Sequence, residues 1–219
     1  MEAKKVPTVA ELTQGLPKNW GRWGAEDEVG SLNFLTQTEV LRGVASVRQG
    51  KTFTLQVQMG NPKGDPVWPG RNQAQRINVL DEGHFLCGKG PEFPGGLHYA
   101  DDVMFMYLQG STQYDALGHV WCDGKLYNGF DANTTIGGMS KASVLPLAER
   151  GIVGRGVLID IARHRGKRFL DPGETFTHLD LLAAAEKQGV TIQKHDVLVI
   201  RTGWIAAFYE KDRAEFYKN

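Results

Sequence analysis

The stretch Gly156-Val-Leu-Ile-Asp-Ile-Ala162 and the later run Val197-Leu-Val-Ile200 are short apolar segments, each typical of a buried strand. Between them lies a segment with apolar residues at helical spacing. Thr177 can cap the start of that helix, and Gly189 can end it. A strand, a helix and a second strand in succession predict an α/β fold with a mixed, partly parallel sheet.

The composition is that of an ordinary globular chain. Of its 219 residues, 41% are apolar and 23% are charged, and 25 Lys and Arg balance 25 Asp and Glu. Zero net charge gives no electrostatic reason to expect DNA or RNA as a partner. No stretch approaches the roughly 18 apolar residues of a membrane span, and the N-terminus lacks the apolar segment of a secretory signal. We therefore expect a cytoplasmic protein that binds neither nucleic acid nor membrane, and the two cysteines fit a reduced setting.

The chain begins with an irregular lead-in, which is followed by the first clear helix. Thr36 and Glu39 are spaced as a capping box. Apolar residues follow at helical spacing, and Gly50 stands where a helix-ending glycine belongs. We predict a division into residues 1–50, an N-terminal extension with its helix, and residues 51–219, the main domain.

The middle of the chain alternates between patterned and unpatterned segments. Residues 52–59 alternate apolar and polar side chains, which predicts a strand. Residues 60–100 are rich in Gly, Pro and Asp, and such a long, weakly patterned segment is typical of a functional loop or arm. The apolar run at residues 103–108 predicts a second, buried strand.

The run from Leu108 to Trp121, LQGSTQYDALGHVW, contains the side chains best suited to catalysis or metal binding. It directly follows the strand predicted at residues 103–108. If the chain stays extended, alternate side chains point to one face. Those side chains are Gln109, Ser111, Gln113 and Asp115. His119 follows beyond Gly118, where the chain can turn. Polar groups would then gather at the end of an apolar strand, where α/β folds tend to place sites.

The donor types in this run favour one class of metal ion. Asp115 supplies an anionic oxygen and His119 an imidazole. Gln109 and Gln113 supply neutral carbonyl oxygens, and an oxygen-rich set suits Mn, Mg or Ca better than Zn. A metal held in this way can acidify a water for attack on a carbonyl, with His119 moving the proton. The alternative interpretation is a hydrogen-bonded turn made by the same residues.

The run resembles the signature H-x-G-T-H-x-D-x-P-x-H of the cyclase-family metal hydrolases, which include bacterial kynurenine formamidase (arylformamidase) and isatin hydrolase. The functional positions of that signature correspond here to Gln109, Gln113, Asp115 and His119. Other stretches resemble the family in the same order along nearly the whole chain. They are residues 19–21, 30–33, 126–129, 156–160 and 196–204. The resemblance implies the swivelling β/β/α fold, usually assembled as homo-oligomers.

The resemblance also implies roles for individual residues. In the family, two histidines and the aspartate bind divalent metal, and the last histidine donates and accepts protons. Asp115 and His119 match the aspartate and the last histidine. Gln109 and Gln113 stand where the family has its metal histidines, and an amide oxygen is a poorer ligand for zinc than imidazole.

The C-terminal end departs from the family pattern. The family places a further histidine and a glutamate well beyond the strand that here ends at Trp204. This chain stops at Asn219, so we expect it to be incomplete at its C-terminus. His164 does not stand in an equivalent context, and His178 and His195 are predicted to be surface residues.

The first functional hypothesis is a metal-dependent hydrolase that opens a small amide. Its substrate would be an N-formyl aryl amide, such as N-formylkynurenine of tryptophan catabolism, or a cyclic amide. Asp115, Gln113 and Gln109 would hold a divalent ion, Mn or Zn, and His119 would transfer the proton. Three nearby aromatic side chains either stack on an aryl substrate or lie in the core. They are Tyr107, Tyr114 and Trp121.

Two other functions stay open. The two glutamines and the absent distal ligands also fit a catalytically inactive homologue that binds a ligand or forms oligomers. A different reaction on the same scaffold, such as dehydration or cyclisation, is the third hypothesis, because a fold does not determine a function.

Overall fold

The computed structural model describes residues 7–211 and 216–217. Contacts divide the chain into two units, each described by itself below. Unit 1 comprises the part of the chain up to Lys51, together with Tyr114–His164 and Phe176–Arg201. Unit 2 comprises Thr52–Gln113, Arg165–Thr175 and the part from Thr202 onward.

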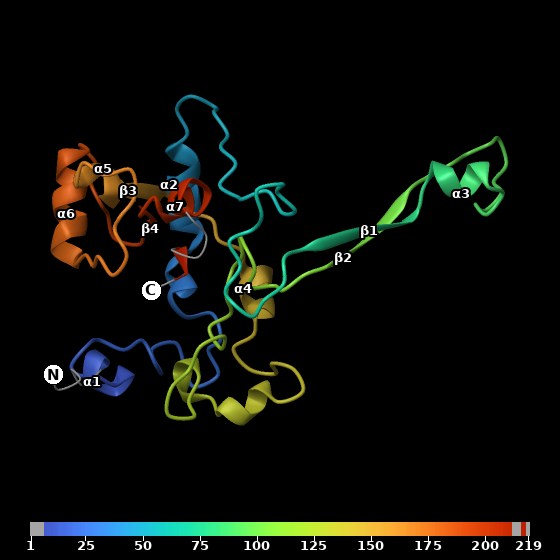
Figure 1. The fold of residues 1–219 in the computed structure, drawn as a ribbon. Helices are drawn as coiled ribbons and strands as arrows, with labels where there is room; N and C mark the ends of the chain where they lie inside the picture. The colour runs from blue at the N-terminus through green and yellow to red at the C-terminus, as the bar shows by residue number, and fades with distance from the viewer. Residues whose placement is uncertain (1–6, 212–215, 218–219) are drawn as a thin grey trace, which may run out of the picture. The chain divides into compact units, whose positions relative to one another are not determined.

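Unit 1 is built around a parallel pair of strands, labelled in Figure 1. Strand β3 (Gly156–Asp160) pairs with β4 (Val197–Arg201) in parallel, and helices α5 (Ile161–His164) and α6 (His178–Lys187) connect them. Thr177 caps α6 in a capping box with Asp180. The strand, helix and strand predicted from the sequence are confirmed, and the fold is mixed α/β with one small parallel and one small antiparallel sheet.

Helix α6 covers one face of this sheet. Val157 and Ile159 of β3 are buried, as are Ala184 and Ala185 of α6. Short alanine side chains let the helix approach the strands closely, and burial of these apolar surfaces stabilises the unit at about 25 cal/mol per Å².

The outer edge of β3 is closed by a side chain. Gln188, at the end of α6, donates its amide to the carbonyl of Leu158 at 2.9 Å and accepts from the backbone N–H of Asp160 at 2.8 Å. One carboxamide thus supplies the donor and the acceptor that a neighbouring strand would supply, and it satisfies backbone groups of an exposed edge.

The remaining elements of unit 1 are short. They are α1 (Val9–Thr13), α2 (Gln37–Ala45), α4 (Val144–Arg150) and the 3-10 turns η1 (Gly30–Phe34), η2 (Tyr127–Gly129) and η3 (Ala132–Thr135). The capping box predicted for Thr36 and Glu39 is confirmed at the start of α2. The helix ends at Ala45 rather than at Gly50, because Ser46 already closes the last turn.

Helix α2 is fastened to the turn before β4 by a histidine and a glutamate. The Nδ1 of His195 lies 3.0 Å from the Glu39 carboxylate, and the His195 ring stacks on Phe34 with centroids 4.6 Å apart. Hydrogen bonds from Thr36 and then from His195 lower the pKa of Glu39 to about 2. The prediction that His195 is a surface residue is therefore wrong, since this long-range contact half-buries its side chain.

A buried carboxylate strengthens the same junction. Asp196 is 1% exposed at its side chain and lies 3.1 Å from Arg42 of α2 and 2.6 Å from Arg155, which precedes β3. It also accepts a hydrogen bond from the backbone N–H of Gln193 at 2.7 Å. A carboxylate this deeply buried requires such partners, because desolvation of an unpaired charge costs several kcal/mol.

A second, half-buried network joins the N-terminal segment to η2. Asp27 accepts hydrogen bonds from the Tyr127 hydroxyl at 2.8 Å and from the Asn33 amide at 2.6 Å. Asn128 donates to the carbonyls of Gly24 and Ala25, both at 3.0 Å. Burial alone would raise the pKa of Asp27, but its hydrogen bonds outweigh that effect and lower it. Two stretches on which the family resemblance depends therefore meet in one structural network.

Unit 2 contains an antiparallel ribbon. Strand β1 (Gln75–Leu80) pairs with β2 (Asp101–Phe105), and α3 (Glu82–Leu86) follows β1 at the far end of the ribbon (Figure 1). Residues 60–100 therefore include an arm, as predicted, but it contains a strand and a helix that the weak pattern did not reveal.

One strand prediction is wrong in this unit, and another is confirmed only in part. Residues 52–59 form no strand, although their side chains alternate, because the described chain pairs no other segment with them. The strand predicted at residues 103–108 ends at Phe105, and it is exposed rather than buried: Val103 is 50% and Phe105 81% exposed.

Unit 2 also contains α7 (Trp204–Glu210), which overlaps residues 205–217, a stretch whose amphipathic pattern is typical of a helix. Residues 212–215 of that stretch lie outside the described residues. Among the helices of the described residues, none is long and apolar enough to cross a membrane.

Replacing Gly203 with alanine should destabilise the protein by about 2 kcal/mol. Gly203 precedes α7 with a φ of +72°, and an added Cβ would lie 2.3 Å from the backbone oxygen of Arg168. Gly166 is the matched control, because its φ of +70° is similar and nothing lies within 4 Å of an added Cβ. Urea unfolding of the two variants measures the difference, and equal losses would contradict the steric account.

Candidate active site

The Leu108–Trp121 run crosses from one unit to the other after Gln113. Its first part, in unit 2, does not continue β2. The chain turns at residues 108–112, and Gly110 lies so close to Tyr107 that an added Cβ would be 2.9 Å from that carbonyl oxygen. Arg71 donates a hydrogen bond to the backbone carbonyl of Gln109 and holds the turn. The run therefore does not stay extended, which was the condition for its alternate side chains to share one face.

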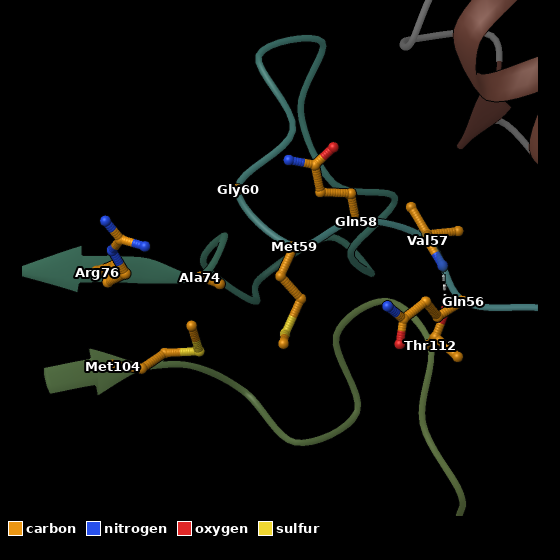
Figure 2. Close-up of a pocket in the computed structure, with 9 residues that line it drawn as sticks. All are labelled: Gln56, Val57, Gln58, Met59, Gly60, Ala74, Arg76, Met104 and Thr112. Carbon is orange, nitrogen blue, oxygen red and sulfur yellow. Dashed lines mark hydrogen bonds between the residues drawn. The ribbon is translucent and has the colours of Figure 1, made fainter. Parts of the chain in front are cut away.

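Thr112 fastens this turn to the preceding loop. Its hydroxyl accepts a hydrogen bond of 2.7 Å from the backbone N–H of Val57, the dashed line in Figure 2. Val57 belongs to the segment whose alternating pattern was predicted as a strand. That segment instead forms a wall beside the motif.

Thr112 and this wall border a pocket of about 450 Å³ that lies wholly within unit 2, which we call the Thr112 pocket. Its volume is in the range of small-molecule sites. It is lined by Gln56, Val57, Gln58, Met59, Gly60, Ala74, Arg76, Met104 and Thr112 (Figure 2). Apart from Thr112, none of these residues was predicted as part of the motif. The alternation of glutamines with apolar residues at positions 56–59 was the one signal that could have identified them.

The second part of the run, in unit 1, contains Asp115 and His119. The chain turns again here, with the N–H of His119 donating to the carbonyl of Ala116 at 3.0 Å. Gly118 is buried, donates to the carbonyl of Ala142 at 2.9 Å, and leaves only 3.1 Å between an added Cβ and that oxygen. The turn predicted at Gly118 is confirmed, and the close approach to Ala142 fixes the backbone that carries His119.

The four predicted functional side chains are not tied to the rest of the protein. Gln109 and His119 are half-buried, and Gln113 and Asp115 are exposed. Within residues 7–211, no hydrogen bond or ion pair involves these four side chains. A hydrogen-bonded turn made by these four side chains is therefore not observed. The turns are held by backbone contacts, by Arg71, and by the hydroxyls of Ser111 and Thr112, of which Ser111 accepts from the Thr112 N–H at 2.6 Å.

The donors of the run fit some metals better than others. The described residues contain no group of three or more His, Cys, Asp or Glu that could hold a metal ion. A metal bound at this motif would therefore depend on amide oxygens. This donor chemistry fits a hard, oxygen-preferring ion such as Mn²⁺, and it does not fit the imidazole- and thiolate-rich sets of Zn²⁺.

The three aromatic candidates do not lie in the core. Tyr107 is 44%, Tyr114 50% and Trp121 47% exposed. Tyr107 borders a separate pocket of about 300 Å³ in unit 2, whereas Tyr114 and Trp121 belong to unit 1. Their role in stacking on a substrate stays a prediction.

The mixed α/β fold and the motif that follows β2 together define a class of enzyme scaffold. A family model described as "Putative cyclase" matches residues 12–219, so the chain belongs to the cyclase family. A crystal structure of a protein described as a novel cyclase is similar, with 34% identity and a TM-score of 0.83 over 92% of this chain and 68% of that chain. No curated protein matches the chain. Membership in this family indicates a cyclase-like or hydrolase-like enzyme.

Proposed function

We propose that the protein hydrolyses a carbon–nitrogen bond of a small amide, either an N-formyl aryl amide or a cyclic amide. The observation that carries the proposal is that the side chains of Asp115 and His119 are unpaired in a chain of this family. Both stand at motif positions, and neither side chain has a partner in the described part of the chain. Unpaired polar groups on a backbone held by Gly118 are free to bind a ligand and to move a proton.

His119 is the proposed proton-transfer residue. An imidazole exchanges protons near neutral pH, so it can take a proton from the attacking water and give one to the leaving nitrogen. The half-buried position of its side chain leaves it accessible to a bound substrate.

A divalent ion, Mn in preference to Zn, is the proposed cofactor, with Asp115 as the anionic ligand and Gln113 and Gln109 as neutral ones. When bound, such an ion lowers the pKa of a water molecule and makes it a better nucleophile. Homo-oligomeric assembly and a cytoplasmic location are likewise proposals that come from the family resemblance and the composition.

The deciding experiment compares wild type with Asp115→Ala after dialysis against a chelator and readdition of Mn or Zn. Metal content and turnover are measured on a panel of a formanilide, a lactam and a hydroxy acid. We expect about one Mn per chain, amide hydrolysis that needs it, and loss of both in Asp115→Ala. Glu149→Ala, an exposed carboxylate of α4, is the control that should change neither. Unchanged amide hydrolysis in Asp115→Ala would overturn the proposal, and turnover of the hydroxy acid alone would favour dehydration or cyclisation.

The second candidate is a catalytically inactive homologue that binds a ligand or forms oligomers. Gln109 and Gln113, at positions where the family resemblance expects metal-binding histidines, favour it. A stable protein that binds a panel compound without metal and without turnover would support this candidate. Measurable hydrolysis that Asp115→Ala abolishes would exclude it.

A further inference from the structure

The Thr112 pocket has polar groups whose bonding capacity is unused. Arg76, on β1, lies 3.0 Å from Asp102 of β2 through its Nε. Within the described chain, no other partner is bound by its guanidinium, so its two terminal nitrogens are free. The carboxamides of Gln56 and Gln58 are likewise without partners in residues 7–211.

The orientation of Arg76 is set by the ribbon. Residues 76 and 104 are opposite each other in the β1–β2 register, and 78 is opposite 102, so all four share one face of the ribbon. Asp102 holds the inner nitrogen of the guanidinium. A guanidinium oriented in this way presents a planar pair of N–H donors, the geometry that binds a carboxylate with two parallel hydrogen bonds.

The rest of the pocket is apolar and adaptable. Figure 2 shows Met59 extending from the loop toward the strand that carries Met104, with Ala74 beside them. Methionine side chains are flexible and polarisable, and they make favourable contacts with aromatic rings. Gln56 lies beside Thr112, at the end of the pocket that adjoins the motif.

We propose that the Thr112 pocket binds a small carboxylate-bearing molecule, with Arg76 holding the carboxylate and Met59 and Met104 contacting an aryl or alkyl body. The inference rests on the proposed function in one respect: it takes the bound carboxylate-bearing molecule to be the substrate of the proposed hydrolysis. The enzyme would then prefer amides that carry a carboxylate over uncharged amides of the same size. Thr112 acts as a positioning residue, because its hydroxyl holds the loop that forms the wall.

A matched pair of probes tests this assignment. N-formylanthranilate carries a carboxylate next to its formamide, and formanilide lacks it. Binding of each is measured by isothermal titration calorimetry in the His119→Ala background, so that neither probe is consumed. We expect Arg76→Gln to weaken binding of N-formylanthranilate by at least tenfold and to leave formanilide binding within about twofold. Arg76→Lys should retain part of the affinity, because it keeps the charge but not the paired donors.

Two controls make the outcome decisive. Arg163→Gln removes the same charge from an exposed arginine of α5 that does not line the pocket, and it should change neither affinity. The Arg76 side chain is 64% exposed, so its replacement should leave the unfolding midpoint unchanged. The assignment would be overturned if Arg76→Gln weakened the binding of both probes equally, or if it left the binding of N-formylanthranilate unchanged.

The failure of this inference can be told apart from the failure of the proposed function. If N-formylanthranilate binds in an Arg76-dependent manner but wild type does not hydrolyse it, the pocket assignment stands and the hydrolase proposal fails. If wild type hydrolyses both probes with equal KM and Arg76→Gln changes neither KM, the hydrolase proposal stands and the pocket assignment fails.

Discussion

Replacing His119 with alanine is expected to lower kcat for amide hydrolysis by a factor of about 10² to 10⁴, the usual contribution of a positioned general acid–base. The free energy of unfolding should stay within about 0.5 kcal/mol of wild type. The physical reason is that the His119 ring has no partner within the described residues, while the backbone at this turn is held by Gly118.

The measurement is steady-state kinetics on the amide that wild type turns over best, with circular dichroism to confirm the fold. His178→Ala is the matched control, because His178 is exposed at the start of α6 and outside the motif. A fall of kcat in His119→Ala that matches the fall in His178→Ala would contradict the assigned role. A rise in KM with unchanged kcat would point to substrate binding instead of proton transfer.

Replacing Asp196 with alanine is expected to cost about 3–5 kcal/mol of stability, the range for breaking a buried ion pair by removing one partner. The carboxylate is 1% exposed and is shared by Arg42 and Arg155. Its removal leaves two partly buried guanidinium groups without their counter-ion, and it leaves the N–H of Gln193 without its acceptor.

Equilibrium urea unfolding checks this value. Asp171→Ala is the control, because Asp171 also pairs with a cation, Lys167 at 2.8 Å, but is 63% exposed. An exposed pair of this kind contributes about 0–1 kcal/mol. Equal losses in the two variants would show that burial of Asp196 adds nothing to its ion pairs.

The elements that the sequence predicted correctly are those whose signals are local. Helices α2 and α6 begin at capping boxes, Thr36 with Glu39 and Thr177 with Asp180, in which all partners lie within three residues. Strand β3 was predicted from a run of apolar residues. Burial of that run requires only that a helix pack against the strand. Such signals can be read from any window of ten residues or so, and the structure confirms them.

The errors arise where pairing decides the structure. Residues 52–59 have a strand pattern without a partner, whereas Gln75–Leu80 have a weak pattern but pair with Asp101–Phe105. A strand is stabilised by hydrogen bonds to another segment, and no local period encodes which segment that is. The prediction that β2 is buried failed for the same reason. An apolar run can be buried only if another element packs against it, and the run itself does not specify that element.

In the candidate site, too, some features follow from the sequence and others only from the tertiary structure. The sequence by itself determined the order of the motif residues, the resemblance that places Gln109 and Gln113 where the family signature has histidine, and the helix and strand signals of unit 1. The tertiary structure alone decided that Thr112 joins the motif to a pocket, that Arg76 lines it, and that His195 and Asp196 bind α2. These contacts join residues tens of positions or more apart, and their free energy depends on burial and on distance in space, which residue order does not specify.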